Sequence, residues 1–177
     1  MNNRESIVLG GGCFWCLDAL YRRVKGVVSV TSGYAGGDTE QPTYEQVGSG
    51  TTNHAEVVNV KFDPKEISLE TILEIFWAMH DPTTRNQQGN DVGTQYRSTI
   101  YYNNDKQKNV IEESLEKVAK KLWNQPITTE IKPLDTFWPA EDYHQDYFSK
   151  NPESGYCQII INPKLNQFKQ KFKNKIK

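Results

Sequence analysis

Gly10-Gly11-Gly12-Cys13-Phe14-Trp15-Cys16 is the segment that decides the fold, because it joins a predicted strand to a predicted helix. The strand-like run Ile7-Val8-Leu9 precedes it, and apolar residues at 14, 17, 20, 21 and 24 repeat at helical spacing. Cys13 is therefore expected at or just before a helix N-terminus. Unpaired backbone N–H groups and the positive end of the helix dipole favour an anion there, so the pattern predicts a thiol that ionises more readily than a free cysteine.

The neighbours of Cys13 are suited to a binding site. The glycine triplet allows another molecule to approach the backbone closely. Phe14 and Trp15 supply an apolar wall beside the sulfur. An aromatic pair next to a thiol is more often part of a hydrophobic core when nothing else is known, so both interpretations stay open at this point.

Length, composition and charge restrict the class of protein. The chain has 177 residues, 36% of them apolar, and we expect one domain over residues 1–177. A net charge of −1, from 21 basic and 22 acidic residues, gives no general attraction to nucleic acid or to an anionic membrane. Residues 1–6 lack the apolar run of a signal peptide, and no later run reaches the roughly 18 residues of a bilayer span. We expect a soluble, cytoplasmic monomer.

The order of the predicted elements indicates an α+β fold. Apolar periodicity predicts strands at 7–9, 27–32, 55–62, 95–102 and 128–134, and helices at 14–24, 68–79, 105–123 and 140–150. Long loops are expected at 33–54 and 80–94. The first six elements run βαββαβ, which is the ferredoxin-like order, and an additional helix and an edge strand containing Pro133 follow.

The C-terminal segment, about 163–177, contains six lysines and no acidic residue. Its apolar residues recur at helical spacing: Leu165, Phe168, Phe172 and Ile176. We expect an amphipathic helix docked on the rest of the chain with its lysines in solvent. A membrane or partner site is the alternative.

Three chemistries are compatible with the cysteines. Cys13, Cys16 and Cys157 with one histidine could form a zinc site, although the chain has no second CxxC. A thioredoxin-like dithiol site is suggested by the CxxC at a helix start, but this interpretation leaves Cys157 unused. The third possibility is a thiolate nucleophile with a proton donor. Glu56, at the start of a strand, is a candidate carboxylic acid with a pKa raised by burial.

Seven blocks of sequence, in order, support the third possibility. They are Gly12-Cys13-Phe14-Trp15, Ser32-Gly33-Tyr34-Ala35-Gly36-Gly37, Asn53-His54-Ala55-Glu56, His80-Asp81-Pro82-Thr83, residues 89–98 (GNDVGTQYRS), residues 140–147 (AEDYHQDY) and Gly155-Tyr156-Cys157. Together they resemble the A type of peptide methionine sulfoxide reductase, which acts on the S-epimer. The resemblance covers residues 5 to about 163.

The resemblance implies a role for each matched residue. Cys13 would attack the sulfoxide sulfur, and Glu56 would donate a proton to the sulfoxide oxygen. Tyr34 and Tyr96 would hydrogen-bond that oxygen, and Asp91 would hold the polar side of the site, directly or through water. Phe14 and Trp15 would enclose the methyl group of the substrate. The implied function is a protein-repair oxidoreductase active in oxidative stress, without metal or organic cofactor.

The resemblance also implies how the enzyme is recycled. Cys13 would become a sulfenic acid, a second thiol would condense with it to a disulfide, and thioredoxin would reduce the disulfide. Cys157 matches the family's resolving position and is the first expectation. Cys16 stands where many members have glycine, and it could compete or take the disulfide in a second exchange. A dithiol-disulfide exchange protein using Cys13 and Cys16 remains the alternative function.

Overall fold

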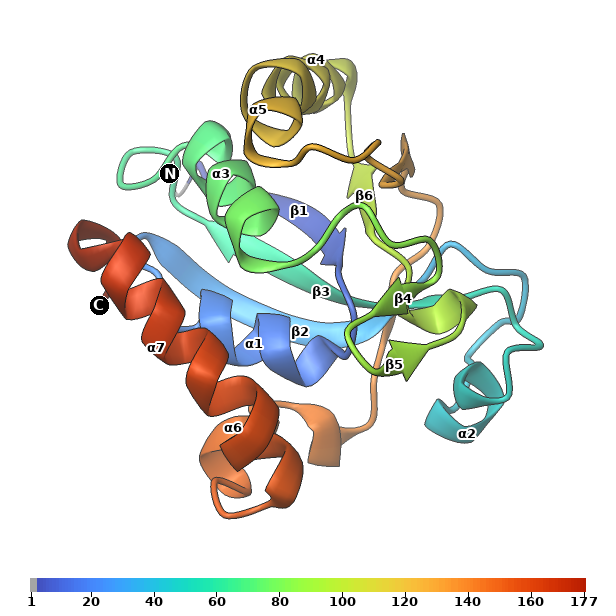
Figure 1. The fold of residues 1–177 in the computed structure, drawn as a ribbon. Helices are drawn as coiled ribbons and strands as arrows, with labels where there is room; N and C mark the ends of the chain where they lie inside the picture. Colours follow the sequence, from blue (N-terminus) through green and yellow to red (C-terminus); the bar gives the residue numbers. More distant parts are fainter. Residues whose placement is uncertain (1–2) are drawn as a thin grey trace.

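The computed structural model describes residues 3–177 and has a six-stranded sheet at its centre (Figure 1). The strands of this sheet are β1 (Glu5–Gly10), β2 (Val27–Ala35), β3 (Ala55–Phe62), β6 (Thr99–Tyr102), β7 (Glu130–Pro133) and β8 (Trp138–Pro139). A separate small hairpin consists of β4 (Gln87–Gln88) and β5 (Asp91–Val92). The helices are α1 (Phe14–Tyr21), α2 (Tyr44–Gly48), α3 (Leu69–Met79), α4 (Asp105–Ser114), α5 (Lys120–Leu122), α6 (Tyr147–Lys150) and α7 (Asn162–Lys171).

The sheet confirms the predicted ferredoxin-like core. Its strand order is β7-β6-β1-β3-β2-β8. β1 pairs antiparallel with β3 and with β6, and β3 pairs antiparallel with β2, so β3 fills the gap that the β1–α1–β2 crossover leaves. β7 adds parallel to β6 at one edge, as the edge strand predicted at 128–134, and β8 adds antiparallel to β2 at the other.

The two faces of the sheet are covered by different parts of the chain. Val58, Val60 and Phe62 alternate along β3 onto the face that carries the helices, where they join the main hydrophobic core. On the opposite face, a smaller cluster forms under the segment between β7 and β8, which contributes Leu134 and Phe137. That segment has to cross this face, because β7 and β8 lie at opposite edges of the sheet.

The loops are more structured than the sequence indicates. β2 continues to Ala35, so Tyr34 lies in a strand opposite Glu56 and not in the predicted loop. The loop predicted at 38–54 contains α2, whose capping box pairs Thr43 with Gln46. The strand predicted at 95–102 begins only at Thr99, because residues 94–96 form a 3₁₀ turn that carries Tyr96. The loop predicted at 80–94 includes the β4–β5 hairpin.

The helices follow their sequence signals with shifted ends. Ser68 caps α3 by accepting a hydrogen bond from the N–H of Thr71, as predicted. The helix predicted at 14–24 ends already at Tyr21, and the one predicted at 105–123 runs through α4, a π-helical segment (Leu115–Ala119) and α5. The helix predicted at 140–150 is divided into a 3₁₀ turn at 142–144 and α6, because Asp146 adopts a left-handed conformation with φ 52°.

The lysine-rich segment forms a docked amphipathic helix, as expected. Leu165 and Phe168 of α7 are buried in the main core, and Ile176 forms a β-bridge with Val24 beyond a further turn at 173–175. Lys169 and Lys171 lie on the exposed side of α7. Within residues 3–177, none of the helices combines the length and apolar character that a bilayer crossing requires.

Candidate active site

Cys13 is the residue that precedes α1, as the sequence predicts. It is the N-cap, with φ −61° and ψ 129°, and its side chain caps no backbone N–H. Gly12, before it, has φ +91°, and a Cβ there would lie 2.7 Å from the side chain of Gln88. The backbone therefore turns sharply between β1 and α1, and it places the thiol where the two elements meet with 8% of the residue exposed.

Glu56 lies next to the start of the same helix. Its Oε1 accepts a hydrogen bond from the backbone N–H of Phe14 over 3.2 Å, and the residue is only 1% exposed. Burial raises its pKa to about 8, while the bond from Phe14 opposes the rise and nearby Asp91 adds to it. The carboxyl group is thus protonated at neutral pH, as the sequence predicts for a proton donor.

The prediction of an easily ionised Cys13 is wrong for this structure. Burial and the neighbouring Glu56 and Cys16 hold the pKa of the Cys13 thiol well above its ordinary value. The backbone N–H of Trp15 and the hydroxyl of Tyr156 lower it, but less than burial raises it. The helix terminus acts in the expected direction, and loss of hydration at an almost enclosed sulfur outweighs it.

A cavity of about 400 Å³ opens beside Cys13. It is lined by Gly11, Cys13, Cys16, Gln88, Gly89, Asn90, Asp91, Tyr156, Ile160 and Lys164. These residues come from three parts of the chain: the β1–α1 connection with the first turn of α1, the β4–β5 hairpin, and residues 156–164, which lead into α7 (Figure 1). The structure therefore brings Cys13, Cys16 and the predicted Asp91 to one cavity.

The two tyrosines expected at the sulfoxide oxygen differ in their partners. Tyr34 is fully buried, and its hydroxyl donates to Oε1 of Glu141 over 2.8 Å. Tyr96 is half-buried, and burial, followed by the charges of Glu56 and Cys13, raises its pKa. Its hydroxyl makes no hydrogen bond within residues 3–177 and is free to donate to a ligand.

Aromatic rings surround the start of α1. Phe14 is fully buried and packs against Tyr34, Tyr44 and His144, with ring centroids 5.7, 6.3 and 5.0 Å away. Trp15 is half-buried, and its indole stacks on Tyr147 at 3.7 Å. Neither ring lines the cavity beside Cys13. Phe14 therefore belongs to the core in this structure, while Trp15 keeps a partly exposed position.

His144 fixes the orientation of Trp15. The indole Nε1–H donates to Nδ1 of His144 over 3.0 Å, and burial lowers the pKa of this histidine, so the ring is neutral and can accept. The Nε2 atom of His144 is buried and has no hydrogen-bond partner within the described residues. His144 is thus part of the site, although its sequence context favours a structural histidine.

Asp91 is held by Tyr156, which precedes the third cysteine. The Tyr156 hydroxyl donates to Oδ2 of Asp91 over 2.9 Å and lies 3.6 Å from the Cys16 sulfur. Its ring also meets Trp15 edge to face at 5.7 Å. Tyr156 thus contacts three predicted site residues, namely Asp91, Cys16 and Trp15, although it was not itself predicted.

All three cysteines are free thiols. Cys16 lines the cavity with Cys13, and its backbone N–H donates to the Cys13 carbonyl over 3.1 Å. Cys157 is 0% exposed and does not line the cavity, but it lies near enough to Cys16 to raise the pKa of that thiol. Cys16 thus raises the pKa of Cys13, and Cys157 in turn raises the pKa of Cys16.

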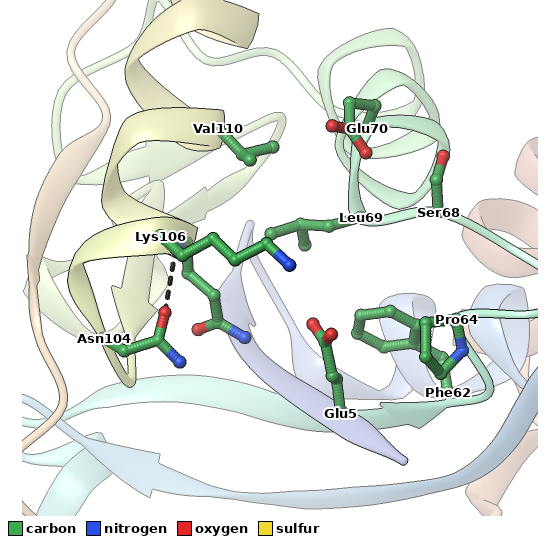
Figure 2. A pocket seen from close by; sticks show the side chains of 10 residues that line it. Glu5, Phe62, Pro64, Ser68, Leu69, Glu70, Asn104, Lys106 and Val110 are labelled. Atoms are coloured by element: carbon green, nitrogen blue, oxygen red, sulfur yellow. Dashed lines mark hydrogen bonds between the residues drawn. The ribbon is translucent and has the colours of Figure 1, made fainter. Parts of the chain in front are cut away.

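A second cavity and the histidine His80 have neighbours other than the predicted site residues. A cavity of about 300 Å³ lies between β1, α3 and α4, with the side chains of Glu5 and Lys106 pointing into it (Figure 2), and it contains no predicted site residue. His80 bonds the Phe76 carbonyl and the Ser98 hydroxyl. Within residues 3–177 no three His, Cys, Asp or Glu side chains form a metal-ligand group, so the zinc alternative has no ligand set there.

Sequence reasoning missed four residues of the site: Tyr44, Glu141, Tyr156 and Lys164. Glu141 is the clearest case, because it accepts hydrogen bonds from both the Tyr34 hydroxyl and the Tyr44 backbone N–H. Glu141 and Tyr156 do occur in the matched sequence blocks at 140–147 and 155–157, which was the available signal. Tyr44 and Lys164 lie outside these blocks, and only the tertiary structure places them here.

Comparisons with known proteins agree with this site. The model of the family described as peptide methionine sulfoxide reductase matches residues 5–176. A peptide methionine sulfoxide reductase MsrA of Arthrobacter sp. (strain FB24) is 57% identical over 161 residues, which are 91% of this chain and 92% of the relative. The MsrA of Saccharolobus solfataricus is 51% identical over 173 residues, 98% of this chain and 97% of the relative.

Solved structures give the same result. Mxr1 from Saccharomyces cerevisiae in reduced form superposes with a TM-score of 0.82 at 36% identity, over 87% of this chain and 89% of that one. Mxr1 in complex with Trx2 gives a TM-score of 0.59 at 27% identity, over 81% and 84% of the two chains. With the family model covering nearly all of its length and relatives above 50% identity, this chain belongs to the peptide methionine sulfoxide reductase family.

Proposed function

We propose that this reductase transfers the sulfoxide oxygen of its substrate to the sulfur of Cys13, with Glu56 as the proton donor. The chain is a peptide-methionine (S)-S-oxide reductase, an oxidoreductase that reduces the S-epimer of methionine sulfoxide by thiol chemistry. The proposal assigns this activity to individual residues.

The observation that carries the proposal is the position of Glu56 at the start of the helix that begins after Cys13. Because Oε1 accepts the Phe14 N–H, the proton of the neutral carboxyl group is available at Oε2. Few positions in a protein keep a carboxylic acid protonated at pH 7, and such a group is suited to general acid catalysis.

The first half-reaction balances without an external proton. Glu56 gives its proton to the sulfoxide oxygen as the Cys13 sulfur attacks the sulfoxide sulfur. The carboxylate then receives the proton that the Cys13 thiol loses. An S–S bond between Cys13 and the substrate forms transiently. The hydroxyl group then passes from the substrate sulfur to the Cys13 sulfur, so the substrate S–O bond and the S–S bond break and an S–O bond to Cys13 forms. Methionine leaves with its sulfur reduced by two electrons, and Cys13 becomes a sulfenic acid, oxidised by two electrons. A Cys13 thiol with a raised pKa fits this scheme, because it keeps its proton until the Glu56 carboxylate can accept it.

We propose Tyr96 as the main hydrogen-bond donor to the sulfoxide oxygen. Its hydroxyl has no partner in the described residues, whereas the hydroxyl of Tyr34 is already used by Glu141. Tyr34 would have to exchange that bond before it could donate to the oxygen. Asp91 holds the polar side through Tyr156. The family resemblance assigns the methyl group to Phe14 and Trp15. Neither ring lines the cavity, and of the two only Trp15 is partly exposed and can meet a methyl group without repacking.

Recycling is proposed to involve both remaining thiols. Cys157 is the first expectation from the resemblance, but Cys16 shares the cavity with Cys13, which supports Cys16 as the thiol that attacks the sulfenic acid first, since a CxxC disulfide across the first turn of a helix is feasible. Cys157 is enclosed, so its attack requires local opening, and it can accept the disulfide from Cys16 in a second exchange. The complex of the yeast relative with Trx2 supports thioredoxin as the final reductant.

Further proposals concern the setting of the enzyme. We propose that the chain acts as one domain and as a monomer in the cytoplasm, on oxidised proteins or free methionine sulfoxide. The near-neutral net charge of −1 supports a protein that does not associate with nucleic acid or anionic membranes.

Dithiothreitol-driven reduction of each methionine sulfoxide epimer tests the proposed function. The wild type is expected to produce methionine from the S-epimer only, and Cys13→Ser is expected to produce none. Cys157→Ser serves as the matched control, because dithiothreitol can reduce the Cys13 sulfenic acid directly. Retention of turnover in Cys13→Ser would contradict the assignment of the nucleophile and favour another thiol.

A further inference from the structure

Lys164 is a half-buried lysine in the wall of the catalytic cavity. It lies in the first turn of α7, and it lines the same 400 Å³ space as Cys13 and Cys16. Among residues 3–177, salt bridges are formed by other cationic side chains and none by Lys164. Its ammonium group therefore pairs with no carboxylate at salt-bridge distance within the described residues, and it shares the cavity with the thiols and with Asp91.

The helix that carries Lys164 is firmly positioned. Leu165 and Phe168 bury one side of α7 in the main core. Pro163, in the first turn, fixes the backbone where the helix begins. The remaining lysines of the segment, such as Lys169 and Lys171, are exposed to solvent. Only Lys164 of this lysine-rich segment is thus directed to the thiols.

The charge of Lys164 acts on Cys16 in particular. Burial raises the pKa of Cys16, and Lys164 is the strongest of the influences that lower it, ahead of the hydrogen bond from Tyr156. Asp91 and Cys157 raise it. The groups that face Cys16 from the surrounding elements are thus Cys13, Asp91, Tyr156, Cys157 and Lys164. For Cys13, the main influences are burial, Glu56 and Cys16.

We propose that Lys164 is a positioning residue for the second half of the reaction, in which its ammonium group, in the same cavity, stabilises the thiolate form of Cys16 that attacks Cys13. The proposal deepens the proposed function and rests on its assignment of Cys13 and Cys16. The Cys16 thiolate attacks the sulfur of the Cys13 sulfenic acid, an S–S bond forms, and the S–O bond breaks. Hydroxide leaves and takes a proton from solvent to become water, which balances the proton that the Cys16 thiol released to solvent. The Cys16 sulfur is oxidised by one unit and the Cys13 sulfur is reduced by one.

The second half-reaction requires a group that stabilises the Cys16 thiolate, whereas the first half-reaction does not. Cys13 can pass its proton to Glu56, whereas within residues 3–177 no carboxylate hydrogen-bonds Cys16 directly, and Asp91 is linked to it only through Tyr156. A buried thiol without a cation close by is mostly protonated at neutral pH, and the protonated form is a poor nucleophile. Lys164 supplies that cation, and it stabilises the same thiolate when a reductant attacks the disulfide and Cys16 is the leaving group.

The first test measures Cys16 alone and does not depend on sulfoxide chemistry. In a Cys13→Ser, Cys157→Ser chain, the alkylation rate of Cys16 by iodoacetamide is followed against pH. Lys164→Met is expected to raise the midpoint by about one pH unit, as loss of a nearby opposite charge does. Lys164→Arg is expected to restore it, and Lys169→Met on the exposed side of α7 should leave it unchanged. An unshifted midpoint in Lys164→Met would overturn the proposal.

The second test measures the reaction step in a Cys157→Ser chain without reductant. Methionine formation is the readout of the proposed function, and Cys13–Cys16 disulfide formation is the readout of this proposal. The two rates are compared within each chain: in Lys164→Met the ratio of disulfide formation to methionine formation is expected to fall roughly tenfold near pH 7, because the Cys16 thiolate fraction falls in that proportion. An unchanged ratio in Lys164→Met, or a lowered ratio also in Lys164→Arg, would contradict a role for the charge. A parent chain that forms no methionine would contradict the proposed function, while the alkylation result would still decide the role of Lys164.

Discussion

The backbone N–H of Phe14 donates a hydrogen bond to Oε1 of Glu56 across 3.2 Å, and it thereby ties the middle of the sheet to the first residue of α1. This bond favours the ionised carboxylate, yet burial dominates and the pKa rises to about 8. The same bond holds the carboxyl group at the N-terminus of α1, where Cys13 is the N-cap residue. Glu56 is therefore both neutral and fixed, which are the two requirements of a general acid.

Glu56→Gln is expected to reduce methionine formation from the S-epimer by roughly a hundredfold or more, because glutamine keeps the shape but carries no transferable proton. Single-turnover methionine formation at pH 7 is the measurement. The exposed Glu66→Gln is the matched control and should behave as the wild type. A Glu56→Gln enzyme with more than half of the normal rate would show that the proton comes from another group.

The activity of the wild type is expected to decline above about pH 8 with a single ionisation, since Glu56 then loses the proton that it is proposed to donate. The measurement is the initial rate of methionine formation from pH 6 to 10 under single-turnover conditions. A rate that keeps rising through pH 9 would mean that ionisation of a thiol, and not of Glu56, limits the first step.

The stability of the fold should depend on pH through the same group. Between the ordinary pKa of 4.5 and about 8, the unfolded chain has lost the Glu56 proton and the folded chain has kept it. The free energy of unfolding contributed by this group is thus fully present below about 4.5 and falls by up to about 1.4 kcal/mol per pH unit until about pH 8.

Glu56→Gln removes this dependence. Urea unfolding at pH 5, 6.5 and 8 is expected to show the variant gaining stability relative to the wild type as the pH rises, with no further gain at pH 9. For Glu66→Gln the difference from the wild type should stay constant. A constant difference for Glu56→Gln as well would indicate an ordinary pKa in the folded state.

Tyr96→Phe is expected to reduce the rate of methionine formation about tenfold to a hundredfold, because it removes the hydroxyl that is free to bond the oxygen. Tyr102→Phe, on the half-buried side of β6, is the control. Tyr34→Phe should instead lower the free energy of unfolding by about 1 kcal/mol or more, since Glu141 loses a donor. If Tyr34→Phe reduced the rate more than Tyr96→Phe at unchanged stability, the two roles would be reversed.

The order of the thiols can be read from disulfides trapped after one turnover without reductant. In Cys157→Ser, peptide mapping is expected to find the Cys13–Cys16 disulfide formed at the wild-type rate. In Cys16→Ser, disulfide formation with Cys157 should be slower, because the enclosed Cys157 reaches Cys13 only after local opening. Equally fast disulfide formation in Cys16→Ser would make Cys157 the first resolving thiol.

Local patterns in the sequence determined much of the fold. The alternation of Val58, Val60 and Phe62 and the helical spacing in residues 68–79 need only the two periodicities of the backbone. The Ser68 cap needs only the N–H of Thr71, three residues along the chain. The order of elements was sufficient for the ferredoxin-like core, because a split βαβ arrangement leaves a single gap for the third strand. The position of Cys13 before α1 followed from the same local signals.

Only the tertiary structure decided the properties of the site. The pKa values of Cys13 and Glu56 depend on how completely distant segments exclude water, and this burial reversed the expectation for the thiol. The bond between Tyr34 and Glu141 joins residues far apart in the chain, and so does the approach of Lys164 to Cys16. Residue types, their spacing and the family resemblance identified the expected reacting groups. The hydration and charge of each group depend on the whole packed chain, so its chemistry is a property of the tertiary structure.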